Sequence, residues 1–269
     1  MVEAAAFRHD HARPPPPKPL IAANWKMNKT VKESISFVKE FEKIVNEKDV
    51  DIVICPAFTS LNVVANEIKN SSIKLGAQNM HFEDSGAYTG EISALMLKEI
   101  GCEYVILGHS ERREIFNEDD FLINKKVIAA LKNNLKPILC VGENMGQRKN
   151  GKTREIIQNQ LKNCLGNIDK NQILKINVAY EPIWAISKGN PNHKAATAED
   201  AEEGHKFIRS VVEKMFGKNI SKNIRIIYGG SMKPENAKEL LGMPNIDGGL
   251  VGNASLNAKN FAEIVQSAK

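Results

Sequence analysis

The stretch LIAANWKMNKTVKESISFVKEFEKIV, residues 20–45, contains one complete strand-and-helix unit. It begins with a short apolar run of the kind that forms a buried strand. Thr30 and Glu33 follow at capping-box spacing, and apolar side chains then recur at three- and four-residue steps: Val31, Ile35, Val38, Phe41 and Val45. The stretch therefore predicts a strand, a connecting loop and an amphipathic helix that packs through this one face.

The same alternation continues along the chain. Seven more β-rich apolar runs lie at residues 51–57, 73–79, 104–110, 136–143, 175–182, 224–230 and 248–254. Strands joined by helical crossovers are parallel, and strands that are apolar on both sides are buried on both faces. Eight such units in about 250 residues favour a single closed (β/α)8 barrel of the α/β class over residues 18–269. An open doubly wound sheet is the alternative, although no Gly-x-Gly-x-x-Gly follows the first run.

Composition argues against membrane and nucleic-acid-binding proteins. The 269 residues are 42% hydrophobic and 26% charged, and no apolar run approaches the ~18 residues of a membrane helix. The net charge of +5 comes mostly from lysines on what read as solvated helix faces, without the basic stripe and interleaved aromatics of nucleic-acid binders. We therefore expect a small anionic substrate, with no membrane or nucleic-acid partner.

The four cysteines stand far apart at positions 55, 102, 140 and 164, with no Cys-x-x-Cys pair. This spacing suggests neither a zinc knuckle nor a disulfide framework, so we expect reduced cysteines in a cytoplasmic protein.

The first 17 residues, MVEAAAFRHDHARPPPP, differ in character from the rest. They lack the continuous apolar core of a signal peptide, and their four prolines favour an extended, solvated tail. We expect residues 1–17 to be a disordered extension or a vector-derived remnant, in which His9 and His11 could bind a metal only weakly. No metal site is predicted.

A barrel of this kind brings the C-terminal ends of its strands together at one mouth. The first strand ends by delivering Asn24 and Lys26, and the fourth, in YVILGHSERREIF (104–116), ends on His109. Glu181 follows the sixth apolar run and precedes a proline that fixes the local backbone. Taken singly, the histidine reads as a structural residue, and the lysine reads equally well as a fixed cation for an anion or as a solvated side chain. A buried carboxylate, by contrast, has a high energetic cost without a purpose.

Two small-residue turns follow the seventh and eighth strands, in YGGSMKPEN (228–236) and VGNASLN (251–257). The backbone N–H groups of Gly230, Ser231, Gly252 and Asn253 can point at one anion there, helped by a helix N-terminus. Each glycine turn alone is weak evidence, but phosphate sites after strands seven and eight recur in this architecture.

Together these groups suit proton abstraction next to a carbonyl. Glu181 would take the proton, and His109 and Lys26 would stabilise the oxygen that becomes negative. The helix that starts behind His109 can aim N–H groups at the ring and disfavour its protonated form. The sequence contains no metal-ligand motif, nucleophile elbow or lysine arranged for a Schiff base, so no cofactor is expected.

Eight stretches resemble, in order and spacing, the signatures of the triosephosphate isomerase family over residues 18–269: NWKMN, CPAFTSL, GAYTGEIS, GHSERR, PILCVGE, AYEPIWAI, YGGSMKPEN and VGNASL. The resemblance implies a TIM barrel that interconverts dihydroxyacetone phosphate and D-glyceraldehyde 3-phosphate through an enediol or enediolate, in glycolysis and gluconeogenesis, without metal or cofactor. It implies Glu181 as base and His109 as electrophile. The resemblance also implies that Asn24 and Lys26 contact the substrate. It implies phosphate contacts from Ser187, Ser231, Gly252 and Asn253. The supporting residues that it implies around this site are Ser110, Glu111 and Gly230.

The sequence departs from the family at two places. Asn253 replaces a usual glycine, and since asparagine tolerates left-handed geometry its N–H contact can survive. The family has a short lid after Trp184, and at that place this chain reads AISKGNPNHKAAT. Ser187 stands where the family usually has a glycine, and NPNH (190–193) is an insertion. We expect slower or less complete lid closure.

The long connection NMHFEDSGAYTGEIS, residues 79–93, predicts a homodimer by the same resemblance. In the family the matching loop reaches into the partner, where Thr89 would approach the Asn24 region.

Two rival functions stay open: a barrel that binds phosphate without turnover, and another phosphosugar enzyme such as an epimerase. The presence of both Glu181 and His109 argues against a pure binder.

Overall fold

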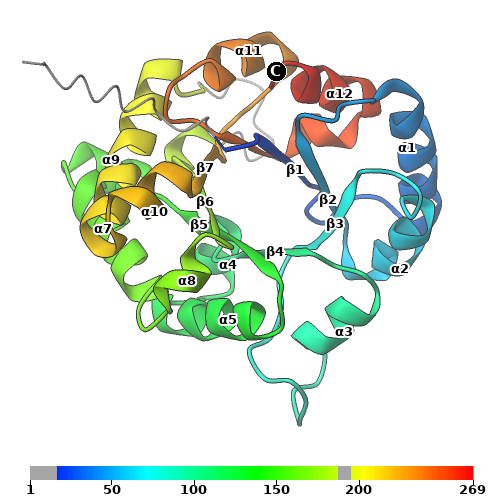
Figure 1. The fold of residues 1–269 in the computed structure, drawn as a ribbon, viewed down its shortest axis with the longest axis horizontal. Helices are drawn as coiled ribbons and strands as arrows, with labels where there is room; N and C mark the ends of the chain where they lie inside the picture. The colour runs from blue at the N-terminus through cyan, green and yellow to red at the C-terminus, as the bar shows by residue number, and fades with distance from the viewer. Residues whose placement is uncertain (1–16, 187–194, 269) are drawn as a thin grey trace, which may run out of the picture.

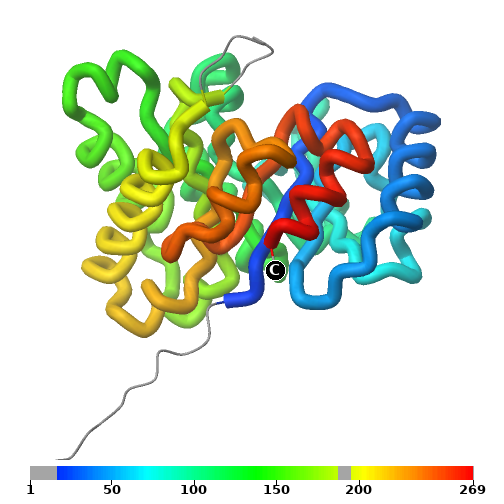
Figure 2. The backbone as a smooth tube through the Cα atoms, turned by 90° about the horizontal axis from the view of Figure 1, so that it is seen from above, coloured from blue at the N-terminus to red at the C-terminus, as the bar shows by residue number. Residues whose placement is uncertain are grey.

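A computed structural model describes residues 17–186 and 195–268. They form a closed barrel of eight parallel strands surrounded by helices, as Figure 1 shows. Seen from above, α1 and α2 lie on one flank of the barrel and α9 on the other (Figure 2). Ser187, the inserted NPNH and all but the last residue of the expected extension lie outside the described residues.

Strand order follows chain order, and β1 pairs in parallel with both β2 and β8. The closed barrel is confirmed and excludes the open sheet. Each predicted apolar run continues past the end of its strand, because its last residues belong to the loops of the mouth. The strands are β1 (Leu20–Asn24), β2 (Asp51–Cys55), β3 (Lys74–Ala77), β4 (Tyr104–Leu107), β5 (Lys136–Val141), β6 (Asn177–Tyr180), β7 (Arg225–Tyr228) and β8 (Gly248–Val251).

Helices occupy the connections between the strands. The α-helices in the described ranges are α1 (Val31–Ile44), α2 (Phe58–Glu67), α3 (Ala94–Glu99), α4 (Ser110–Ile115), α5 (Asp120–Lys132), α6 (Met145–Lys149), α7 (Thr153–Cys164), α8 (Lys170–Ile173), α9 (Ala198–Phe216), α10 (Lys218–Asn223), α11 (Pro234–Leu241) and α12 (Ala258–Gln266). Two short 3-10 helices, η1 (Ile183–Ala185) and η2 (Asn253–Leu256), follow β6 and β8.

The first helix begins as predicted but buries a different face. The Thr30 side chain accepts the Glu33 N–H, and the Glu33 carboxylate accepts the Thr30 N–H at 2.7 Å, so the capping box is confirmed. The buried side chains of α1 are Ser34, Phe37, Val38 and Phe41. Val31 is 40% exposed, so the predicted face is wrong at its start.

Successive residues of each strand point to opposite sides of the barrel wall and so form two separate cores. In β1, Leu20 and Ala22 join the small cluster inside the barrel, whereas Ile21 and Ala23 join the large cluster beneath the helices. Both sides of most strand positions are therefore buried, which is why the strands read as nearly continuous apolar runs.

Closure of the barrel depends on a glycine at the start of β8. Gly248 pairs with Leu20 and has a φ of +145°, a conformation that residues with side chains rarely adopt. A Cβ at this position would overlap the Leu20 carbonyl group. Only glycine therefore lets β8 approach β1 closely enough to pair.

A polar network joins strands at the end of the barrel opposite the mouth. The Arg225 guanidinium donates to Asp51 Oδ2 and to Asn177 Oδ1, both at 2.7 Å. Lys18 lies 2.9 Å from the other Asp51 oxygen. Burial tends to raise the pKa of Asp51, but hydrogen bonds from Lys18 and Arg225 hold that pKa below its usual value. The network ties β2, β6 and β7 together.

We expect Arg225→Leu to lower the free energy of unfolding by about 1–3 kcal/mol, because it removes the donor to the buried Asn177 Oδ1 and leaves Asp51 with Lys18 alone. Lys18→Met is the matched control: it removes a more exposed partner of the same carboxylate and should cost less than about 1 kcal/mol. Because Asp51 has a lower pKa folded than unfolded, its contribution is present above about pH 4 and is lost as the pH falls through its folded pKa. Urea unfolding at several pH values tests this, and equal losses in the two variants would contradict it.

Candidate active site

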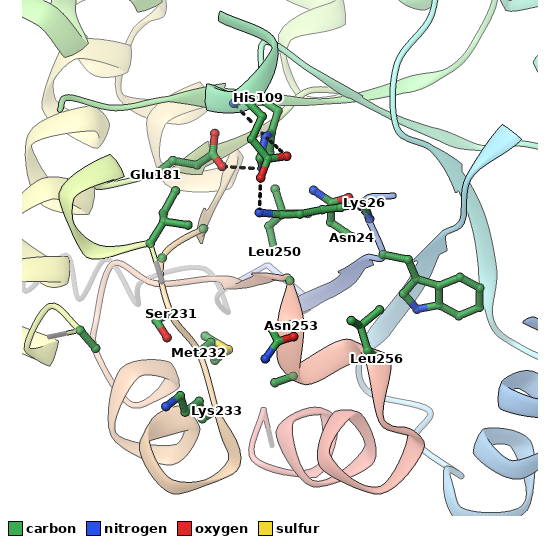
Figure 3. Close-up of a pocket in the computed structure, with 18 of the residues that line it drawn as sticks. Asn24, Lys26, His109, Glu181, Ser231, Met232, Lys233, Leu250, Asn253 and Leu256 are labelled. Carbon is green, nitrogen blue, oxygen red and sulfur yellow. Dashed lines mark hydrogen bonds and ion pairs between the residues drawn. The ribbon is translucent and has the colours of Figure 1, made fainter. Parts of the chain in front are cut away.

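A cavity of about 770 Å³ opens at the C-terminal ends of the strands. Nine of the predicted site residues line it: Asn24, Lys26, His109, Glu111, Glu181, Gly230, Ser231, Gly252 and Asn253. In Figure 3, His109 and Glu181 lie at one end of the cavity, with Lys26 reaching toward them, and Ser231 and Asn253 lie at the other. The structure thus brings together the residues that the sequence predicts, apart from Ser187 and Thr89.

His109 stands directly before α4 and acts as its N-cap. Its Nδ1 accepts the Glu111 N–H at 3.3 Å, and the Glu111 carboxylate lies 3.5 Å from the same nitrogen. A ring nitrogen that accepts an N–H carries no proton, so in this arrangement the ring donates through Nε2. That nitrogen faces Glu181 Oε1 at 2.9 Å.

Glu181 is almost completely buried, with 3% of its side chain exposed. Its Oε2 accepts the Ser110 N–H at 3.0 Å, and its Oε1 lies 2.9 Å from His109 Nε2. Burial tends to raise the pKa of this carboxyl, but His109, the Ser110 N–H and Lys26 lower that pKa below its usual value. At neutral pH the site therefore holds a carboxylate paired with His109, and such a carboxylate can act as a base.

The backbone of Glu181 is placed by a close approach between β5 and β6. The Glu181 N–H donates to the Val141 carbonyl at 2.8 Å, which extends the strand pairing by one residue. Gly142 follows Val141 in the chain, and a Cβ on Gly142 would overlap the Glu181 carbonyl group. Gly142 is a positioning residue that the sequence analysis missed.

Lys26 reaches the cavity from a strained backbone. Its φ is +52°, and its ammonium donates to Glu111 Oε1 at 2.6 Å. Asn24 accepts the Lys26 N–H at 3.1 Å, and Gln78 donates to the Lys26 carbonyl at 2.9 Å and the Cys55 carbonyl at 3.0 Å. Sequence reasoning missed Gln78, although its position after a strand, like those of Asn24 and His109, was a signal.

The predicted phosphate contacts differ from expectation in two details. The Ser231 N–H, expected to face an anion, donates to the Ala185 carbonyl at 3.3 Å. Asn253 is not among the residues with positive φ; it begins η2, so the tolerance of asparagine for left-handed geometry is not needed here. The local turn is a 3-10 helix, and the contact between the Asn253 N–H and phosphate stays a prediction.

A second buried carboxylate, Glu143, also escaped the sequence analysis. It follows β5, is fully buried, and accepts hydrogen bonds from Trp184 Nε1 at 2.9 Å and Tyr180 Oη at 3.2 Å. The Arg148 guanidinium lies 4.1 Å from the centre of the Trp184 ring. These contacts hold η1 where the chain leaves the barrel wall. The signal was a glutamate at a strand end, the same feature that identified Glu181.

The described residues contain no cluster of three His, Cys, Asp or Glu side chains that could hold a metal ion. No helix in the described ranges is both long and apolar enough to cross a membrane.

Comparison with known proteins agrees with the geometry of the site. The sequence model of one protein family, described as Triosephosphate isomerase, matches residues 19–268. A triosephosphate isomerase of Clostridium botulinum is 51% identical over 91% of this chain and 98% of its own length. Those of Aquifex aeolicus and Chloroherpeton thalassium are 51% and 48% identical over 92% and 94% of this chain, and over 98% and 99% of their own lengths. As the ordered motifs predicted, the chain belongs to the triosephosphate isomerase family of enzymes.

Proposed function

We propose that the protein interconverts dihydroxyacetone phosphate and D-glyceraldehyde 3-phosphate by proton transfer through an enediol or enediolate, a step of glycolysis and gluconeogenesis. The observation that carries the proposal is the buried pair formed by the Glu181 carboxylate and the His109 imidazole, whose Oε1 and Nε2 atoms lie 2.9 Å apart at the mouth of the barrel. The sequence identity of about 50% to enzymes named for this reaction supports it.

The reaction needs one base and two donors. Glu181 removes a proton from the carbon next to the carbonyl, and the electron pair of that C–H bond forms the enediolate double bond while the carbonyl oxygen gains the negative charge. The Nε2–H of His109 and the ammonium of Lys26 donate to that oxygen. His109 gives its Nε2 proton to that oxygen and takes up the proton of the neighbouring hydroxyl, so that the charge moves to the second oxygen. Glu181 then returns the carbon-bound proton to the former carbonyl carbon as the second oxygen becomes the new carbonyl, which completes the isomerisation and restores the neutral imidazole. Every proton and electron pair stays within substrate and site, so the proposed cycle needs no cofactor.

The phosphate group is proposed to bind at the opposite end of the cavity, to the N–H groups of Ser231, Gly252 and Asn253, with Ser187 as a further contact outside the described residues. Phosphate is bound well by converging N–H groups. Because the Ser231 N–H donates to Ala185 in this structure, binding there breaks a hydrogen bond to η1. Phosphate binding and movement of the chain after Trp184 are therefore proposed to be coupled.

A homodimer is proposed from the surface around the loop between β3 and α3. This loop projects from the barrel body in Figure 1. Within it, the His81 ring lies 4.4 Å from the Phe82 ring and 4.2 Å from the Tyr88 ring, measured between centroids, so the projection is internally packed. Exposed apolar side chains lie in the loop and on α3, the helix that follows it: Tyr88 at 43%, Leu95 at 52% and Met96 at 51%. A second copy that received Thr89 near its own Asn24 would cover this surface.

The rival functions are separable in one assay. A coupled assay that starts from glyceraldehyde 3-phosphate gives turnover only for the isomerase, and neither a phosphate-binding barrel nor an epimerase forms dihydroxyacetone phosphate.

The four buried free cysteines are in keeping with a reducing compartment, and we propose that the protein is located in the cytoplasm.

Glu181→Gln should lower kcat by about 10²–10⁴-fold while leaving KM nearly unchanged, because the base is lost and the phosphate contacts stay. Steady-state kinetics in both directions measure this. Glu203→Gln, on the exposed surface, is the control and should behave as wild type. Retention of more than about half of the wild-type kcat in Glu181→Gln would overturn the assignment.

His109→Gln should reduce kcat more than it raises KM, because the donor at Nε2 acts on the oxygen only as charge develops there. The same assay gives both constants, and a variant with raised KM and unchanged kcat would show that His109 serves binding alone.

Thr89→Asp should weaken self-association and activity together, because it places a charge at the tip that enters the partner. Sedimentation velocity at micromolar concentration, paired with the activity assay, measures both. Ser72→Asp, on the exposed surface before β3, is the control and should leave both unchanged. A fully active wild-type monomer at that concentration would refute the dimer.

A further inference from the structure

The loop after β1 contains a second lysine in the left-handed conformation. Lys26 has a φ of +52° and Lys29 a φ of +70°. Residues with side chains seldom adopt this conformation, and it persists where the surroundings hold the residue in place. Lys26 has a role in the proposed reaction, but Lys29 does not line the cavity. Its strained backbone has to be explained by other contacts.

The Lys29 ammonium occupies a slot built from two aromatic rings and one carbonyl group. It donates to the Leu256 carbonyl at 2.8 Å, and it lies 5.4 Å from the centre of the Trp25 ring and 4.8 Å from that of the Phe37 ring. Trp25 and Phe37 are buried and meet edge to face. An ammonium over aromatic faces is stabilised by the ring quadrupoles, so this position suits a cation specifically.

The partner carbonyl belongs to the turn that follows β8. Leu256 ends η2, the single 3-10 turn that begins at Asn253 and follows Gly252. At the other end of the turn, the Gly252 carbonyl accepts the Ser255 N–H at 2.9 Å and the Ser255 hydroxyl at 2.7 Å. Carbonyl groups at the end of so short a turn have no partner within it, and Lys29 supplies one from 227 residues away in the sequence.

The two lysines contact the turn at opposite ends. A Cβ at Gly252 would lie 3.6 Å from Lys26 Cε, so Lys26 packs against the end nearest the cavity. Lys29 holds the end at Leu256, which also lines the cavity. The loop after β1 therefore contacts both ends of the turn whose N–H groups are proposed to bind the phosphate.

We propose that Lys29 is a positioning residue for phosphate recognition: by fixing η2 through the Leu256 carbonyl, it orients the N–H groups of Gly252 and Asn253 before substrate arrives. The inference rests on the proposed function. A group held in place before binding loses less conformational freedom on binding, so the effect falls on affinity. Lys29 lies away from Glu181 and His109, so the proton-transfer step itself is left unchanged.

Four variants separate positioning from simple charge. Lys29→Met removes both donor and charge, Lys29→Gln keeps a neutral donor, and Lys29→Arg keeps donor, charge and ring contacts. Lys32→Met, at the exposed start of α1, removes a neighbouring positive charge without breaking these contacts. Inorganic phosphate serves as the probe, through its inhibition constant against the substrate and through calorimetric titration in the absence of substrate.

We expect Lys29→Met to raise KM and the inhibition constant of inorganic phosphate by about five- to twentyfold, with kcat within about twofold of wild type. Lys29→Arg should restore wild-type values within about twofold, Lys29→Gln should fall between, and Lys32→Met should match wild type. The difference between Lys29→Met and wild type should persist at 0.5 M salt, where a long-range charge effect is screened.

Three results would overturn the proposal. The first is an unchanged KM and phosphate affinity in Lys29→Met. The second is a defect that is equal in Lys29→Met and Lys29→Gln and vanishes at high salt, which would mean charge alone. The third is loss of kcat without loss of affinity. Circular dichroism and thermal unfolding check each variant, and if Lys29→Met fails to fold, the Gln and Arg variants carry the same comparison. If wild type binds phosphate but shows no isomerase activity, the proposed function fails while the Lys29 titrations still decide the positioning role.

Discussion

The pairing of β1 with β8 is the constraint on which the rest of the structure depends. It joins the two ends of the sheet through Leu20 and Gly248, and the glycine is needed because a side chain would overlap the β1 backbone. Once the barrel is closed, the C-terminal ends of all strands face one cavity. Closure also brings the loop after β1 against the turn after β8, so that Lys26 and Lys29 contact residues more than 200 positions away.

Two buried carboxylates, Glu143 and Glu181, follow neighbouring strands and differ in their hydrogen-bond partners. Glu143 accepts hydrogen bonds from Trp184 and Tyr180 and holds η1 in place. Glu181 has one oxygen bonded to the Ser110 N–H and the other 2.9 Å from His109 Nε2. Its nearest partners are therefore a backbone amide and an imidazole, and a buried carboxylate that faces an imidazole in a cavity is an arrangement typical of a catalytic base.

The positively charged side chains of the mouth depend on backbone that is itself strained. Lys26 keeps its left-handed conformation because Asn24 and Gln78 bind its N–H and carbonyl groups from two different strands. Its ammonium is aimed by Glu111, which also donates its N–H to His109. Base, imidazole and ammonium thus form one connected network, in which a change at any member alters the others.

The sequence by itself determined the barrel, the family and the composition of the mouth. Apolar runs alternating with amphipathic helices specify parallel strands whatever their partners are, and polar residues such as His109 and Glu181 could be placed because strand ends converge in any closed barrel. The tertiary structure alone decided the exposed start of α1 at Val31, the 3-10 conformation at Asn253, the use of the Ser231 N–H by Ala185 and the part played by Gln78. Each of these depends on which group lies opposite in space. Such neighbours come from distant parts of the chain, and no local pattern of residues records them.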